Sequence, residues 1–332
     1  MSRAVLALPG KGAYTASALG SLAGDPLLGA VDERRAEHGL LPLAELDAAE
    51  VFVPGIHLRP ANAAPLIYLG SLRDADLLAD EHELVAVVGN GLGWCTALAV
   101  GGVLDRVDGL RLVQEIGLAQ ELASAADDAG GQLLYPMTDT EWHPIPERAT
   151  DVAAALSAVA GAAWPSIELG PYVVLAGSAS GLEGLTRVLP PITIGKRQYP
   201  LRLALSGPDH SPLAAPVAAM VAGATSAIAF GMPRLTLIDG RGARHTPWSA
   251  DPSELADYTR GDYLVTTYRF ATSVRVALRE YAPDVILLPG PGETLGGVVG
   301  GIIVVDGYRG IRNRAALAAE HAARPLIVSS AS

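Results

Sequence analysis

The chain of 332 residues is 50% hydrophobic and 18% charged, a composition that excludes an extended disordered protein and predicts a large buried core. Its formal net charge of −11 argues against a nucleic-acid-binding surface, because phosphate binding depends on clustered Lys and Arg. The single cysteine, Cys95, excludes an internal disulfide framework and a cysteine-based zinc site, and it fits a cytoplasmic protein. We expect no metal, no other cofactor and no nucleic-acid partner.

The N-terminal segment predicts a buried strand over residues 4–8, a turn over 9–12 and a small helix over 15–23. The apolar run before Pro9 is too short for a secretory signal. A Gly-x-Gly turn after a strand can open a dinucleotide-binding fingerprint, but the later glycine and the closing acidic residue of that motif are not evident. The sequence therefore gives little support to a dinucleotide site.

The next part of the chain predicts helices over 32–38 and 64–78, followed by a strand, a turn and a helix. Residues 84–88 are an apolar run of strand length, residues 89–93 are Gly-Asn-Gly-Leu-Gly, and a helix is expected over 94–100. In α/β hydrolases a G-x-S-x-G turn at this position exposes a nucleophilic serine. Here the flanking glycines are present and the central residue is Gly91, so the turn lacks the usual nucleophile.

The middle of the chain changes in pattern after a helix expected over 105–126. We predict, in order, a strand over 130–137, a helix over 147–161, a strand over 166–176, a helix over 181–189 and one or two strands over 191–205. This alternation indicates a small α/β subdomain, residues 128–198, inserted between the two parts of a larger domain, residues 1–127 and 199–332.

The last third predicts a return to the large domain. Strands are expected over 235–239 and 284–288, with a helix over 271–281 and a glycine-rich segment over 289–301. The uncharged run 213–232 is long enough for a membrane span, but its Ala, Gly and Pro content favours a buried helix followed by a strand. We therefore expect no membrane association.

Five short motifs follow one another along nearly the whole chain. They are Pro9-Gly10-x-Gly12, Gly89-x-x-x-Gly93, Leu110-Arg111-Leu112-Val113, Ser206-Gly-x-x-His210-Ser211-Pro212-Leu213 and Pro289-Gly290-Pro291-Gly292. In this order they resemble the malonyl-CoA:acyl carrier protein transacylase family, which includes the acyltransferase domains of polyketide synthases. The resemblance implies an α/β fold, with a hydrolase-like large domain on a mostly parallel sheet, an inserted ferredoxin-like subdomain and an active-site cleft between them. It also implies coenzyme A thioesters and acyl carrier protein as partners.

His210 lies between a predicted strand and a predicted helix, where sheet enzymes hold a general base, although a lone histidine is more often structural or solvated. The resemblance matches His210 to the catalytic histidine of the family, and it implies that the backbone carbonyl of Arg269 orients the imidazole. The backbone N–H groups of Lys11 and Leu92 match the oxyanion-hole positions, and such groups survive changes of side chain.

The departures from the family fall on its chemistry. The elbow histidine and the nucleophilic serine of the family are Asn90 and Gly91 here, the glutamine after Pro-Gly is Lys11, and the arginine that pairs with the malonyl carboxylate falls at Ile116. Without a serine Oγ no acyl-enzyme ester can form at Gly91, and without a fixed cation a buried malonyl carboxylate is disfavoured. The alternative interpretation of Gly91 is a turn left relaxed after loss of activity.

Several further residues have two interpretations each. Cys95, one helical turn after Gly91, is either a replacement nucleophile or a small buried side chain. Trp94 either lines the pocket or packs in the core, and the ammonium of Lys11 either binds a carboxylate or carbonyl in the cleft or is solvated. The most basic short stretch would either dock an acidic carrier protein or form a charged strand edge, and it consists of Lys196, Arg197 and Arg202.

We therefore expect an acyltransferase-fold enzyme of fatty-acid or polyketide biosynthesis that acts on a carrier- or CoA-bound acyl thioester without a serine acyl-enzyme. His210 would be the general base, and hydrolysis and intramolecular acyl transfer, including cyclisation, both fit. The alternative is a noncatalytic scaffold that binds an acyl carrier protein and derives from a malonyl transacylase.

Overall fold

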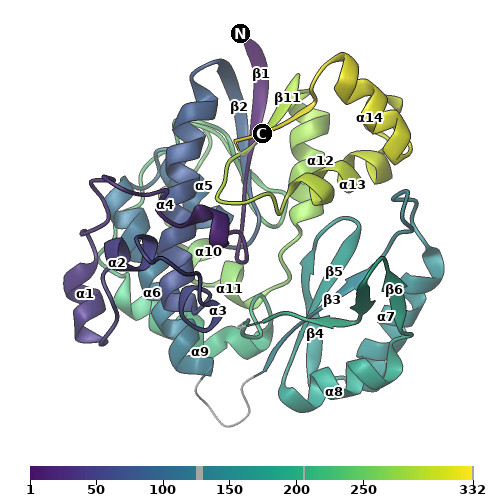
Figure 1. Cartoon of the computed structure of the whole chain (residues 1–332), viewed down its shortest axis with the longest axis horizontal. Coiled ribbons are helices and arrows are strands. Elements are labelled where there is room, and N and C mark those ends of the chain that lie inside the picture. Colours follow the sequence, from purple (N-terminus) through teal and green to yellow (C-terminus); the bar gives the residue numbers. More distant parts are fainter. Residues whose placement is uncertain (125–129, 205, 331–332) are drawn as a thin grey trace.

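The computed structural model describes residues 1–124, 130–204 and 206–330, which form a large α/β domain and a smaller subdomain beside it (Figure 1). Each part has its own hydrophobic core. The two-part α/β architecture expected from the resemblance is confirmed.

The large domain is built on a six-stranded sheet in the order β10-β9-β2-β1-β11-β12. All neighbouring strands in it are parallel except β9 and β10. The strands are β1 (Ser2–Leu8), β2 (His82–Gly89), β9 (Leu237–Ile238), β10 (Arg244–His245), β11 (Val285–Leu288) and β12 (Ile327–Ser329). The central strand β1 pairs with β2 and β11, and its residues 4–8 are at most 2% exposed, as an apolar strand covered on both faces should be.

Helices cover both faces of this sheet. Figure 1 shows α4 and α6 to the left of the central strands and α12, α13 and α14 to their right. The helices of the large domain are α1 (Asp32–Glu37), α2 (Leu43–Asp47), α3 (Pro54–His57), α4 (Pro60–Ala79), α5 (Gly93–Val100), α6 (Arg106–Ser124), α9 (Ala215–Ala224), α10 (Pro252–Arg260), α11 (Asp262–Val265), α12 (Phe270–Tyr281), α13 (Gly296–Asp306) and α14 (Arg314–Ala323). Short 3-10 turns lie at Ala16–Ala18, Pro212–Ala214 and Tyr308–Gly310.

The small subdomain has the ferredoxin-like arrangement. Its elements are β3 (Gly131–Pro136), α7 (Pro146–Ala158), β4 (Ala163–Glu168), β5 (Tyr172–Gly177), α8 (Ala179–Val188), the hairpin β6 (Ile192–Ile194) and β7 (Arg197–Tyr199), and β8 (Leu201–Arg202). The sheet order β4-β5-β3-β8, with all pairs antiparallel, is that of a β-α-β-β-α-β unit. The expected boundary at 198 is therefore too early, because it falls within β7 and leaves β8 outside, while the boundary at 127/128 lies outside the described residues.

Three other expectations need correction. The helix expected over 15–23 is a single 3-10 turn, because glycines at 20 and 24 adopt φ of +75° and +82° and stop a continuous helix. The strand expected over 166–176 is a hairpin of two strands that turns at Gly170, whose φ is +73°. The uncharged run 213–232 contains only the ten residues of α9 as α-helix, and no helix among the described residues is long and apolar enough to cross a membrane.

The small subdomain is packed closely against α13. A Cβ on Gly300 would lie 3.0 Å from the Trp142 ring, and one on Gly301 would lie 2.7 Å from Pro171, so larger residues there would push the two parts of the molecule apart. The two glycines therefore allow the small subdomain to lie this close to α13.

Candidate active site

A cavity of about 370 Å³ lies between the large domain and the small subdomain. The large domain contributes the loop after β1, the turn after β2 and the inner face of α6, and the small subdomain contributes residues from β3, β4 and β5. The polar side chains that line the cavity are Lys11, Asn90, Gln120, Gln132, Ser206, Asp209, His210, Tyr263 and Thr294, and the rest of the lining is mostly aliphatic.

The turn between β2 and α5 has the geometry of a nucleophile elbow. A Cβ on Gly89 would lie 2.1 Å from the carbonyl carbon of Gly93, and one on Gly93 would lie 2.4 Å from the Leu8 carbonyl oxygen, so both positions require glycine. Between them Gly91 has φ of +50°, a left-handed conformation that glycine adopts without strain. Asn90 keeps the turn beside β1 through its N–H, which donates to the Leu8 carbonyl at 2.9 Å.

His210 faces this turn from the loop before α9. Its Nε2 lies 3.3 Å from the point that a Cβ on Gly91 would occupy. Its Nδ1 lies 2.7 Å from the carbonyl oxygen of Tyr263, and a carbonyl can only accept, so Nδ1 carries the proton and Nε2 is left as the basic nitrogen. Burial lowers the pKa of His210, which is 6% exposed, and this favours the neutral imidazole that a general base requires.

The carbonyl that orients His210 belongs to Tyr263, not to Arg269 as expected. The Arg269 carbonyl instead accepts the N–H of Ser273 at 3.1 Å in the first turn of α12, and its side chain is exposed beside Glu168. The expectation failed because a backbone carbonyl leaves no signature in the side-chain pattern.

The loop after β1 lies beside the elbow because β1 and β2 end at the same level, with Leu8 opposite Gly89. Lys11 and Leu92 consequently both line the cavity. Within the ranges that the structure describes, neither of their backbone N–H groups has a hydrogen-bond partner. Both N–H groups are thus available as donors, and that of Leu92 is at the N-terminal end of α5, where the helix dipole favours negative charge.

The side chain of Lys11 is not a solvated lysine. Its Nζ lies 2.7 Å from Asp209 Oδ2, and the other oxygen of Asp209 accepts the Gln120 amide at 2.8 Å. Sequence reasoning missed Asp209 and Gln120. Gln120 follows Ile116 by one helical turn on α6, so helical spacing alone would have placed both on the cavity-facing side.

Two expected pocket residues differ in outcome. Ile116 lines the cavity and is 1% exposed, at the position expected for the missing arginine. Trp94 does not line it: the indole is fully buried, donates to Thr259 Oγ1 at 3.0 Å and packs edge-on against Tyr258. The core interpretation of Trp94 is therefore the correct one, because α5 turns this side chain beneath the elbow.

Cys95 is also directed into the core. It is 0% exposed, its Sγ lies 3.8 Å from the Tyr263 hydroxyl, and burial raises the pKa of the thiol to about 12. A thiol without solvent access and without thiolate character at neutral pH is no nucleophile.

Comparison with solved structures finds the same fold in malonyl transacylases. The malonyl transacylase of a type II polyketide synthase, solved with its acyl carrier protein, is 21% identical with a TM-score of 0.73, over 91% of this chain and 93% of that one. The Xanthomonas oryzae malonyl-CoA:acyl carrier protein transacylase is 20% identical (TM-score 0.72; 91% and 92% covered), and the Streptococcus pneumoniae enzyme is 22% identical (0.70; 96% and 98%). The chain has the malonyl transacylase fold. No protein-family model and no curated protein matches it.

The residues proposed for carrier docking lie away from the cavity, with one exception. Lys196 and Arg197 are exposed at the turn of the β6–β7 hairpin, which Figure 1 shows beside α7 on the side of the small subdomain farther from the large domain. Arg202, exposed on β8, directly precedes Leu203, which lines the cavity, but its register opposite Leu133 puts its side chain on the other face of the strand.

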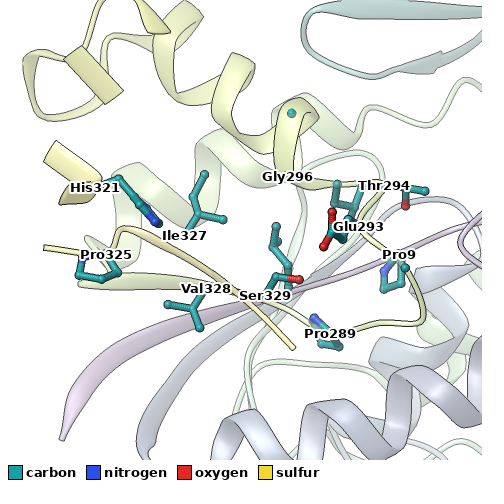
Figure 2. A pocket seen from close by; sticks show the side chains of 14 residues that line it. Pro9, Pro289, Glu293, Thr294, Gly296, His321, Pro325, Ile327, Val328 and Ser329 are labelled. Atoms are coloured by element: carbon teal, nitrogen blue, oxygen red, sulfur yellow. The ribbon is translucent and has the colours of Figure 1, made fainter. Parts of the chain in front are cut away.

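A second cavity, of about 610 Å³, lies at the ends of β11 and β12 and is drawn in Figure 2. Its titratable side chains, Glu293 and His321, lie on opposite sides of the view. Thr294 and Leu295 line both cavities, so the turn before α13 lies between them. The first cavity is the candidate active site because it alone contains His210 and the elbow.

Proposed function

We propose that this protein acts on an acyl thioester carried by an acyl carrier protein or coenzyme A, and that it does so without a serine acyl-enzyme. The observation that carries the proposal is the position of His210 Nε2 on the cavity wall, 3.3 Å from the point that a Cβ on Gly91 would occupy, where Gly91 has no side chain to act as the nucleophile. Water or a hydroxyl of the substrate would then be the nucleophile, in the cavity space beside this basic nitrogen.

The chemistry follows from the groups around that space. His210 Nε2 takes the proton of the attacking hydroxyl as its oxygen bonds to the thioester carbon. The carbonyl oxygen becomes an oxyanion, which accepts hydrogen bonds from the N–H groups of Lys11 and Leu92. When the C–S bond breaks, the imidazolium returns the proton to the leaving thiolate. Attack by water gives a free acid, and attack by a hydroxyl of the acyl chain gives a cyclic ester.

A malonyl group is a poor substrate in this proposal. Ile116 offers no charge to a free carboxylate, and the ammonium of Lys11 already has Asp209 as its counterion. A second carboxylate brought into this apolar cavity would be desolvated without a cation of its own.

The test is incubation of the protein with a panel of acyl-CoA and acyl-carrier thioesters, with assay of thiol release and intact-protein mass spectrometry. We expect release of thiol from a non-malonyl thioester with no covalent adduct on the protein. Release that requires a stable adduct, above all on Cys95, would refute the mechanism.

The noncatalytic scaffold remains the second candidate, and the lack of any side chain at Gly91 favours it. It predicts saturable binding of the acyl carrier protein without thiol release from any thioester, and binding that is unchanged in His210→Ala. Thiol release that His210→Ala abolishes would exclude it.

A further inference from the structure

Three polar side chains form a connected network on one wall of the active-site cavity. The ammonium of Lys11 contacts Asp209 Oδ2 at 2.7 Å, and Gln120 donates its amide to Asp209 Oδ1 at 2.8 Å. The network joins the loop after β1, helix α6 and the residue next to His210, which are distant in sequence. All three residues line the cavity.

The network is balanced in charge. The only formal charges in it are the ammonium of Lys11 and the carboxylate of Asp209, which neutralise each other in a site where Asp209 is 8% exposed. An anionic group on an acyl chain would therefore meet Asp209 as well as Lys11, and a cationic group would meet Lys11 as well as Asp209. Neutral polar groups meet no such opposition.

The network also has unused hydrogen-bonding capacity. Gln120 is only 6% exposed, and its Oε1 atom is buried without a hydrogen-bond partner among the described residues. Buried acceptors are nearly always paired, so this one calls for a donor supplied from outside the chain. Lys11 has three N–H donors, of which one is directed at Asp209, so the same wall offers donors as well as an acceptor.

We infer that the Lys11–Asp209–Gln120 network binds a neutral hydroxyl on the acyl chain, so that the substrate is a hydroxyacyl thioester. A hydroxyl both donates and accepts, and it can pair with Gln120 Oε1 and with an N–H of Lys11 without adding charge. A plain alkyl chain would leave the Gln120 acceptor unpaired, and a carboxyacyl chain would be opposed by Asp209. This inference rests on the proposed function, because it names the substrate of the same cavity.

Binding to non-reactive amide analogues tests the inference without turnover. Pantetheine amides of butyrate, of 2-, 3- and 4-hydroxybutyrate and of malonate would be titrated into the full-length protein by calorimetry. We expect at least one hydroxybutyryl amide to bind about tenfold more tightly than the butyryl amide, the gain of one or two hydrogen bonds. Equal affinities for butyrate and all three hydroxybutyrates would overturn the inference.

Two variants assign the effect to the network. Gln120→Met has similar length and no acceptor, and it should reduce the hydroxybutyryl preference to within about twofold while butyryl binding is kept. The matched control is Ile116→Val on the same face of α6, which removes one methyl group and should weaken both ligands equally. A preference that survives in a folded Gln120→Met protein would contradict the assignment.

Asp209→Asn supplies a gain of function that a folding defect cannot imitate. It keeps an oxygen that can accept from Gln120 but frees the Lys11 ammonium from its counterion, so the malonyl amide should bind about tenfold more tightly than to the wild type. Adding Lys11→Met should cancel that gain. No gain in Asp209→Asn would show that Lys11 does not face the acyl chain.

The binding preference and the turnover can be measured independently, so the subsite and the proposed function can fail separately. Loss of turnover in His210→Ala with the hydroxyl preference retained supports both statements. A hydroxyl preference in a protein that turns over no thioester would support the hydroxyl subsite and refute the catalytic proposal. Turnover without a hydroxyl preference would support the catalytic proposal and refute the subsite.

Discussion

Two turns face each other across the active-site cavity, and both have left-handed backbone. Gly91 has φ of +50° and His210 has φ of +53°. Glycine adopts this conformation freely, whereas for a histidine it costs about 1–2 kcal/mol. The elbow is therefore relaxed at the position where the family has its nucleophile, and the opposite turn still holds a strained residue.

The strain at His210 is held by contacts from several elements. The Tyr263 carbonyl accepts a hydrogen bond from the imidazole Nδ1, and the ring centroids of Tyr263 and Tyr268 lie 5.3 and 5.2 Å from that of His210. In the preceding residue, the Asp209 carbonyl accepts a hydrogen bond from Ser166 of the small subdomain at 2.7 Å. Strained backbone persists only where the surroundings enforce it, and it concentrates at functional sites. The contrast between the turns is therefore one argument for the proposal that His210 acts without a nucleophile at the elbow.

Removing the imidazole should have the largest effect. We expect His210→Ala to reduce thiol release from the true substrate by about 10²- to 10⁴-fold, the usual contribution of a general base. The control is Cys95→Ala, which should cost about 1 kcal/mol of stability and leave the rate of the folded protein within twofold. An unchanged rate of thiol release in His210→Ala would show that the histidine turn does not supply the general base.

The strain has its own measurement. His210→Gly should be more stable to urea than His210→Ala by about 1 kcal/mol, because glycine relieves the left-handed conformation. Equal unfolding free energies would remove the argument that the histidine turn is strained.

Rebuilding the nucleophile is the reverse test. Gly91→Ser puts a Cβ 3.3 Å from His210 Nε2, and with Asn90→His we expect self-acylation by acyl-CoA, detected by mass spectrometry. Because Ile116 offers no cation, acetyl and malonyl groups should label at similar rates, and a strong malonyl preference would contradict its role. Gly91→Ala carries the same backbone cost, about 1 kcal/mol, and should give no adduct.

The pH dependence of the rate distinguishes the charges beside the histidine. Burial lowers the pKa of His210, and Lys11 lowers that pKa further, whereas Asp209 and the Tyr263 carbonyl raise it. The rate requires neutral imidazole, so it should fall on acidification with a midpoint below the usual value of about 6.5. Lys11→Met should move this midpoint upward and Asp209→Asn downward. Shifts in the same direction would show that another group controls the acid limb.

Local sequence patterns predicted the elbow and the histidine of this site, whereas the parts that they did not predict depend on contacts between residues far apart in the sequence. The elbow was predictable because strand, glycine turn and helix are contiguous, with glycine required at 89 and 93 by backbone contacts. The Lys11–Asp209 pair joins residues 198 positions apart, and the Tyr263 carbonyl has no side-chain signature. Trp94 was ambiguous because its direction depends on the rotation of α5, which the aromatic contacts beneath the sheet decide.

The smallest expected effect concerns the docking of a carrier protein at the cavity between the Gly91 and His210 turns. If carrier protein approaches the cavity between the two turns, Arg202 is one residue from Leu203 in the cavity wall, although its side chain is on the opposite face of β8, whereas Lys196 and Arg197 lie on the β6–β7 hairpin. Arg202→Glu should raise KM for a carrier-bound substrate about three- to tenfold and leave KM for the coenzyme A thioester unchanged, because a rim charge acts mainly on encounter. The double variant Lys196→Glu/Arg197→Glu is the matched control and should act less than twofold. A larger effect from the hairpin than from Arg202 would place the carrier on the outer side of the small subdomain, and an effect on both substrates would indicate a change in the cavity itself.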